Sequence, residues 1–183
     1  MKDTLPLIPT ECMREAKMLK MRKSFKEDWT SLPYLVVSVT GYVAALLDFV
    51  FLQNLTFQVF ALVGLCLLVI GGYLRFKARL GLKEKAGFSS LASTGRLQIV
   101  ESHRLVKDGL YKHVRHPLYL GETLRNFGFV LIFSSIYGVL FMAVGTIFLL
   151  LRIRIEEKML IEAFGEDYKE YQTNTRRIIP YIY

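Results

Sequence analysis

The sequence predicts an all-α integral membrane protein in which four transmembrane helices form two hairpins, with amphipathic cytosolic helices beside them. Three observations predict this class. Of the 183 residues, 52% are hydrophobic, which favours a membrane protein over a water-soluble one. These residues gather in long runs, and about twenty apolar residues suffice for a helix to cross the hydrocarbon core. The Lys and Arg residues lie almost entirely between the runs.

The first two spans are expected to form a tight helical hairpin over residues 32–75. The first runs from Leu32 to Leu52, with Pro33 in the first turn, where a missing N–H group costs nothing. A linker of only two residues separates it from the second apolar run, Leu55 to Leu74. Small residues in this second run would let another helix approach closely, namely Gly64, Gly71 and Gly72.

The last apolar region, Tyr119 to Leu151, is either one long tilted helix or two shorter helices that turn at Ser134 and Ser135. Charge decides between these alternatives. All Lys and Arg residues except Arg125 fall in the amino-terminal arm, in the stretch between the two hairpins, or in the tail. Two crossings place all three segments on one face, as the positive-inside rule requires. We therefore expect a second hairpin over residues 118–151 and both termini in the cytosol.

No internal repeat or low-complexity linker divides the chain, so residues 1–183 are interpreted as one domain. Its parts are a cytosolic arm (1–31), the first hairpin (32–75), a cytosolic connection (76–117), the second hairpin (118–151) and a cytosolic carboxy-terminal helix and tail (152–183). Residues 75–85 are predicted to extend the second span, and residues 87–95 to form a loop. The pattern from Ile153 to Tyr171 is typical of an amphipathic helix, with a bend at Gly165.

The composition excludes several kinds of partner. The net charge of +8 does not indicate nucleic acid binding, because the basic residues form no single stripe on a polar domain. We expect the lipid bilayer, with its anionic surface, to be the partner. Cys12 and Cys66 are the only cysteines and indicate neither a disulfide framework nor a thiolate site. His113 and His116, even together with Glu156 and Glu157, lack a spacing specific to metal ligands, so no metal is predicted.

Charged residues gather where the third span begins. Pro117 cannot continue a helix from before it but suits a first helical turn, so Arg115 and His116 should lie at the membrane edge. The free N–H groups of a helix amino terminus favour a carboxylate or phosphate there. The alternative is that these residues only anchor the helix at the lipid headgroups.

Two further charged pairs are candidates for a site. Glu122 and Arg125 lie one turn apart within the third span and can pair, and intramembrane charges of this kind often line a functional cavity. Arg152 and Glu156 share a helix face just beyond the fourth span, where a surface ion pair is the alternative explanation. If the last region turns back as predicted, this face meets His116.

Two stretches then identify a family. Residues 103–121 read HRLVKDGLYKHVRHPLYLG, and residues 152–171 follow the pattern RxxxEExxLxxxFGxxYxxY, with Pro180 beyond. Both stretches, in this order, resemble the isoprenylcysteine carboxyl methyltransferase family and the related phospholipid methyltransferases. The resemblance covers the carboxy-terminal half. The chain is much shorter than the eukaryotic members, which favours a prokaryotic relative in the cell membrane.

The resemblance implies a multi-pass membrane enzyme that uses S-adenosylmethionine to methylate a lipophilic or lipidated acceptor, in the first instance a carboxylate. The resemblance implies Arg152 in catalysis, through contact with the acceptor. Glu157 is a further catalytic candidate, as a base for an amine acceptor. Glu122 and Arg125 are candidates for contact with the acceptor because they are intramembrane charges. The residues implied in cofactor binding are His103, Arg104, Leu105, Val106, Tyr111, Arg115, His116, Pro117, Leu118, Tyr119 and Glu156, with Gln98, or alternatively Arg96, as an upstream candidate near the adenine. Of these, Glu156 would face the cofactor ammonium group.

Three other functions remain open at this point. An amine N-methyltransferase of the same family would have to remove a proton from its acceptor before transfer. A membrane sterol-type reductase would bind NADPH through a similar carboxy-terminal motif, although Pro117 and the Glu156–Glu157 pair look more like the methyltransferase branch. A non-catalytic lipid-binding protein would bind neither cofactor.

Overall fold

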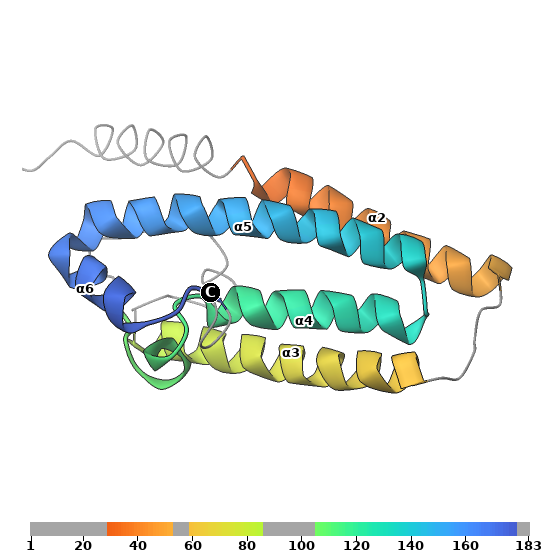
Figure 1. Ribbon diagram of the computed structural model, residues 1–183, viewed down its shortest axis with the longest axis horizontal. Coiled ribbons are helices and arrows are strands. Elements are labelled where there is room, and N and C mark those ends of the chain that lie inside the picture. Colours follow the sequence, from red (N-terminus) through yellow and green to blue (C-terminus); the bar gives the residue numbers. More distant parts are fainter. Residues whose placement is uncertain (1–28, 53–58, 86–104, 179–183) are drawn as a thin grey trace, which may run out of the picture.

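The computed structural model describes residues 29–52, 59–85 and 105–178. This part of the chain is helical, apart from short connections. Its elements are α2 (Ser31–Leu52), α3 (Val59–Lys85), the 3-10 turn η2 (Gly109–Lys112), α4 (Pro117–Ile132), α5 (Ile136–Phe164) and α6 (Glu166–Asn174). The four long helices run side by side, and η2 and α6 lie together at one end (Figure 1).

Within the described residues, three helices are long and apolar enough to cross a membrane: Ser31–Phe51 in α2, Val59–Lys85 (α3) and Ile136–Phe164 (α5). Large apolar side chains on α2, α3 and α5 are exposed, as expected of surfaces that face lipid. The protein is therefore a multi-pass membrane protein. Helix α4 lies alongside the others, but its 16 residues span only about 24 Å at the usual helical rise. The predicted fourth crossing stays a prediction.

The last apolar region forms two helices, as the charge distribution favoured. Helix α4 ends at Ile132 and α5 begins at Ile136. Ser134 adopts a positive φ of 51°, and the Ser135 side chain caps α5 by accepting a hydrogen bond from the Gly138 amide at 2.9 Å. The Ser135 hydroxyl also donates to Asp48, which fixes the turn against α2.

Helices α3 and α4 are in backbone contact through two pairs of glycines. A Cβ atom on Gly71 would lie 2.6 Å from the Gly121 carbonyl oxygen, and one on Gly121 would lie 2.7 Å from that of Gly71. Gly64 and Gly128 face each other in the same way, at 2.8 and 2.7 Å. This confirms close approach for Gly64 and Gly71. The expectation for Gly72 is wrong, because a Cβ atom there would meet nothing within 4 Å.

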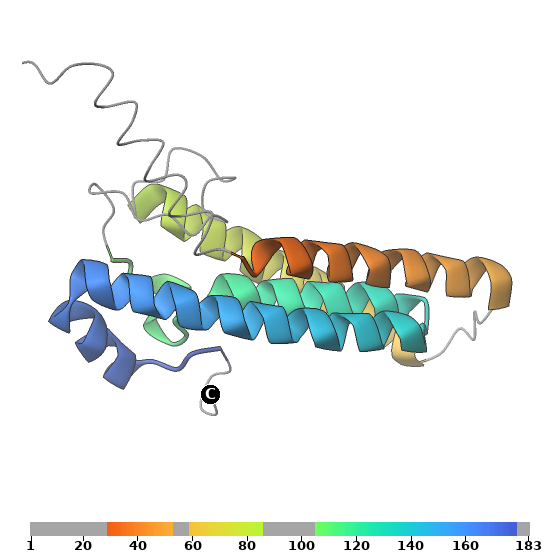
Figure 2. The same ribbon diagram turned by 90° about the horizontal axis from the view of Figure 1, so that it is seen from above.

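The packing partners differ from the tight first hairpin that the sequence suggested. Helix α3 packs against α4, and α2 packs mainly against α5 (Figure 1, Figure 2). The glycines of α3 match those of α4, whereas α2 buries Ala45 beside Met142 of α5 and Val130 of α4. Shape complementarity between helix faces thus decides the partner, not nearness along the chain.

At the end that holds η2, α3 continues to Lys85, which confirms the predicted helical extension. The predicted loop at residues 87–95 lies outside the described residues. Helix α5 continues without a break from its apolar part to Phe164, and Gly165, with φ 56°, separates it from α6. The predicted bend at Gly165 is therefore confirmed. Beyond it, α6 turns back towards the start of α4 (Figure 1, Figure 2).

Candidate active site

His116 occupies the N-cap of α4, and Pro117 is the first helical residue, as the sequence predicted. The backbone before the helix is held by the chain that follows α6. The Arg115 amide donates to the Arg176 carbonyl at 2.7 Å, and the His116 amide donates to the Arg177 carbonyl at 3.1 Å. The His116 side chain is buried, with 3% of its surface exposed. The first N–H groups of a helix lack intrahelical partners, so donors point out of α4 beside this imidazole.

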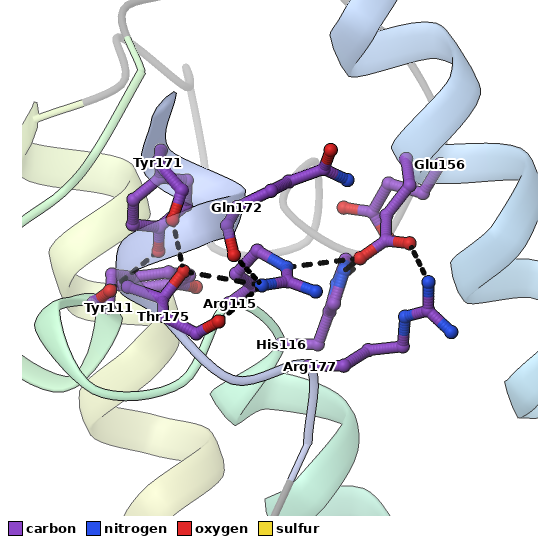
Figure 3. A network of polar contacts seen from close by, with 9 residues as sticks. Tyr111, Arg115, His116, Glu156, Tyr171, Gln172, Thr175 and Arg177 are labelled. Atoms are coloured by element: carbon purple, nitrogen blue, oxygen red, sulfur yellow. Dashed lines mark hydrogen bonds and ion pairs between the residues drawn. The ribbon is translucent and has the colours of Figure 1, made fainter. Parts of the chain in front are cut away.

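Two adjacent carboxylates of α5 approach His116 from the other side. Its Nδ1 atom lies 3.7 Å from Oε2 of Glu156, and its Nε2 atom lies 3.4 Å from Oε1 of Glu157. The start of α4 and the end of α5 thus meet, as the predicted reversal of the chain required. Figure 3 shows His116 and Glu156 facing each other across this junction.

Glu157 is the centre of an ion-pair network. Its carboxylate lies 3.1 Å from Nε of Arg115 and 2.7 Å from Nη2 of Arg177. The Arg115 guanidinium also donates to the backbone carbonyls of Gln172, at 2.9 Å, and of Thr175 (Figure 3). Because Arg115 and Glu157 are both largely buried, the network ties α6 and the following residues to α4 and α5.

Arg152 lies one turn before Glu156 on α5 and is buried, with 6% of its surface exposed. Its Nε atom donates to the Tyr119 hydroxyl at 3.1 Å, and its Nη1 atom donates to the Ser31 hydroxyl. The ring of Tyr119 in turn lies 5.7 Å from that of His116. Arg152 is therefore linked to the His116 junction through an aromatic side chain, and to α2 through a hydroxyl.

An apolar cluster lies on the other side of the α4 start. Val106, Tyr111 and Leu118 are buried there with Ala78 of α3. The Tyr171 hydroxyl donates to the Tyr111 carbonyl at 2.6 Å. Burial raises the pKa of both tyrosines, which keeps them neutral. Of the remaining residues that the resemblance implied, Leu105 is partly buried beside Val106, whereas Gln98, His103 and Arg104 lie outside the described residues.

Glu122 and Arg125 pair as the sequence predicted, but in a separate cluster deeper along α4. Oε1 of Glu122 accepts from Nη2 of Arg125 at 2.7 Å and from the Tyr34 hydroxyl at 2.9 Å. Arg75 of α3 also pairs with Glu122. Asn126 extends the cluster by donating to the Tyr34 hydroxyl at 2.8 Å. This group belongs to α2, α3 and α4.

Sequence reasoning missed several of these partners. They are Ser31, Tyr34, Arg75, Gln172, Thr175 and Arg177. For Arg75 a signal existed, because a cation that ends an apolar run can turn back into the helix bundle to meet an acid. The contacts of Arg177 had no such signal, since they depend on how the chain after α6 folds back.

The polar atoms suit an ammonium group more than a metal ion. Oε2 of Glu156 is buried and has no hydrogen-bond partner among the described residues, and its 3.7 Å separation from His116 exceeds a hydrogen bond. An anionic acceptor of this kind is satisfied by an added cationic donor. In residues 29–52, 59–85 and 105–178, no group of three or more His, Cys, Asp or Glu side chains could hold a metal ion.

Comparisons with known proteins agree with the resemblance. A model of the isoprenylcysteine carboxyl methyltransferase (ICMT) family matches residues 62–162. The protein-S-isoprenylcysteine O-methyltransferase of Schizosaccharomyces pombe is 33% identical over 133 residues, covering 72% of this chain and 54% of that protein. Methanethiol S-methyltransferase 1 of Bradyrhizobium diazoefficiens is 38% identical over 72 residues, covering 39% and 25% respectively.

The fold is also similar to a solved structure. The eukaryotic intramembrane Ras methyltransferase ICMT superposes with a TM-score of 0.64 at 28% sequence identity, over 83% of this chain and 53% of that one. The chain spans about half the length of the first curated relatives it matches: 54% of the S. pombe protein and 54% of the protein-S-isoprenylcysteine O-methyltransferase of Saccharomyces cerevisiae.

Proposed function

Because this chain belongs to the isoprenylcysteine carboxyl methyltransferase family, we propose that it methylates a lipophilic acceptor, in the first instance a carboxylate, with S-adenosylmethionine as the methyl donor. The proposal is based on one structural observation. The start of α4 and the end of α5 bring His116, Glu156 and Arg152 to a single polar junction, next to the apolar cluster around Tyr111. Such a junction combines charged groups that can bind a zwitterion with an apolar surface against which an aromatic base can pack.

The residues present fit this cofactor. The unsatisfied Oε2 atom of Glu156 would accept from the ammonium group, and the amino terminus of α4 would receive the carboxylate. Val106, Tyr111 and Leu118 would line the adenosine, with Gln98, His103 and Arg104 as further proposed contacts. When bound, the cofactor supplies an electrophilic methyl group on a sulfonium.

Arg152 is proposed to orient the acceptor. Its guanidinium lies between Tyr119 and Ser31, on the α2 side of the junction, where a ligand arriving from the bilayer could reach it. A carboxylate acceptor is already a nucleophile, so the protein has only to align it and exclude water. We assign no base to this reaction.

Glu157 is proposed as a positioning residue rather than a proton acceptor. Its carboxylate is shared by Arg115, Arg177 and His116, and cationic partners of this kind stabilise the ionised form of a carboxylate. An anion held so firmly is a weak general base. Its network instead fixes the imidazole of His116 at the start of α4.

We propose that this end of the molecule faces the cytosol. The basic residues of α3 near Lys85, those before α4 and those after α5 share the end that holds the site. The positive-inside rule then places both termini on the cytosolic side, provided that α4 crosses as a fourth span.

A thiol acceptor is the second candidate. The 38% identity to a methanethiol S-methyltransferase exceeds that to the S. pombe carboxyl methyltransferase, 33%, although it covers fewer residues. A thiol needs to lose its proton before transfer, whereas a carboxylate does not, so the two reactions differ in their pH dependence.

The test is methyl transfer by the detergent-purified chain. The protein is incubated with methyl-labelled S-adenosylmethionine and, in separate reactions, with N-acetyl-S-farnesylcysteine, phosphatidylethanolamine, an alkyl thiol or a sterol. Labelled farnesylcysteine methyl ester is the expected product. Calorimetric titration with S-adenosylhomocysteine and with NADPH runs in parallel. Binding of NADPH alone, without any methyl transfer, would replace this proposal with a reductase.

A further inference from the structure

A second polar cluster lies within the helix bundle, where α3 and α4 touch. Arg75 and Arg79 are four residues apart and so project from one face of α3. The backbones meet at this level, since a Cβ atom on Gly121 would lie 2.6 Å from the Arg75 amide nitrogen. Arg75 and Arg125 of α4 both pair with the Glu122 carboxylate, which brings their guanidiniums together. Three cationic side chains therefore start from neighbouring points on two helices.

This cluster holds more positive than negative charge. Glu122 is the only carboxylate paired with it in the described part of the chain, and it binds Arg75 and Arg125. Arg79 has no ion-pair partner there, and its Nε atom is buried without a hydrogen bond. Arg79 is only partly exposed, and an unpaired cation that is partly removed from water is costly, because its desolvation is not offset by an opposite charge. An added anion would remove this imbalance.

The acceptor groups of the cluster are already engaged on the α2 side. Oδ1 of Asn126 accepts from the Tyr42 hydroxyl and from Nη2 of Arg125, while Glu122 accepts from Tyr34. The donors that remain belong to the arginines. The side chains of Arg75 and Arg125 are 19% and 37% exposed, so a ligand can reach them from the surface of the helix pair.

We infer that Arg75, Arg79 and Arg125 form an oxyanion-binding site that takes the carboxylate or phosphate of an amphipathic ligand. Guanidinium groups bind both oxyanions through paired, charge-assisted hydrogen bonds. Glu122 lies about 8 Å along α4 from Pro117 at the usual rise per residue, which suits a ligand with a charged head near the interface and an apolar tail. Two sources meet this description: an anionic lipid headgroup, and the carboxylate of the methyl acceptor before it moves on to Arg152 for transfer.

The site is adjacent to the proposed reaction centre but separate from it. Ser31 of α2 contacts Arg152, and Tyr34, on the same helix face about one turn later, contacts Glu122. An anion that binds at the arginines would thus lie beside the segment of α2 that also touches the acceptor-orienting arginine. The acceptor source rests on the proposed function, whereas the lipid source does not.

The test compares Arg79→Gln with Lys77→Gln in the full purified chain. Within the described residues, Arg79 pairs with no carboxylate. Its replacement therefore leaves no acid without a partner there and should keep the fold intact. Lys77 is an exposed cation on the same helix, hydrogen-bonded to Tyr73 at 3.2 Å, and serves as the matched control. Native mass spectrometry compares how much phosphatidylglycerol and how much phosphatidylcholine each variant retains. Equilibrium binding of N-acetyl-S-farnesylcysteine is measured against that of its carboxamide.

Arg79→Gln should reduce retention of phosphatidylglycerol, or binding of the farnesylcysteine acid, by about tenfold, an effect near that of one charge-assisted hydrogen bond. The neutral competitors and the Lys77→Gln variant should show no such loss. Loss of the lipid alone assigns the site to a headgroup, and loss of the acid alone assigns it to the acceptor. Equal effects of the two variants, or no effect of either, overturn the inference. Binding of S-adenosylhomocysteine, measured on the same samples, reports separately on the proposed function.

Discussion

Nδ1 of His116 lies 3.7 Å from Oε2 of Glu156, which brings the residue before α4 next to the carboxy-terminal part of α5. This separation is longer than a hydrogen bond. The Glu156 carboxylate therefore lies near the imidazole ring but does not use its hydrogen-bonding capacity on it. Glu157, its neighbour, has three cationic or imidazole partners instead. Two consecutive acids of one helix thus lie in different electrostatic surroundings.

Glu156→Gln should weaken cofactor binding by about 1.5 to 3 kcal/mol, because a hydrogen bond to an ionised group is lost while the side-chain shape is kept. Calorimetric titration with S-adenosylhomocysteine measures the effect. Glu162→Gln is the matched control, since Glu162 is exposed on the same helix. Unchanged affinity in the Glu156 variant would show that the ammonium group is held elsewhere.

Arg152→Ala should impair the acceptor step and leave cofactor affinity close to that of the unmodified protein. The buried guanidinium contacts Tyr119 and Ser31, on the α2 side of the junction. The rate of methyl transfer at rising acceptor concentration, together with cofactor titration, separates the two effects. Arg154→Ala removes an exposed arginine two residues away and should change neither. A loss of cofactor binding in Arg152→Ala would contradict the assigned role.

Gly71→Ala should destabilise the α3–α4 pair by about 1 to 3 kcal/mol, the usual cost of overpacking. The added methyl group would meet the Gly121 carbonyl at 2.6 Å, and backbone atoms cannot move aside as a flexible side chain can. Thermal unfolding in detergent measures the change. Gly72→Ala is an internal control because its Cβ atom would meet nothing within 4 Å. Equal unfolding temperatures for both variants would mean that the helices are not in backbone contact.

The sequence predicted those features that depend on local chemistry. Pro117 could start a helix but not continue one, and Gly165 could adopt the positive φ that ends α5. Glu122 and Arg125 pair because one helical turn separates them. Each of these outcomes follows from a few neighbouring residues.

Features that depend on matching distant surfaces were not predictable in this way. Nothing in the α3 sequence states that Gly71 faces Gly121 rather than a residue of α2, so the tight first hairpin was the simpler expectation. The contact of Arg177 with Glu157 requires the chain after α6 to return to α4. Tyr34 lies in an apolar run, and its hydroxyl gives no hint of its partner until Glu122 is placed beside it.

Arg115→Gln should release the segment after α6 from the rest of the site. The guanidinium joins the Glu157 carboxylate, at 3.1 Å, to the backbone carbonyls of Gln172 and Thr175, and breaking a buried pair of this kind costs about 3 to 5 kcal/mol. Amide hydrogen exchange at Arg176 should accelerate by at least about tenfold, because its N–H group donates to the His113 carbonyl, on the backbone that Arg115 anchors.

Lys112→Gln is the control for this prediction, since Lys112 is an exposed cation three residues earlier in the chain. Exchange at Arg176 should be unchanged in that variant. The Arg115 variant should also bind S-adenosylhomocysteine more weakly, because His116 is held between the same segment and the two acids of α5. Fast exchange with full cofactor affinity would show that the segment is fixed independently of the site, and the network would then stabilise the fold alone.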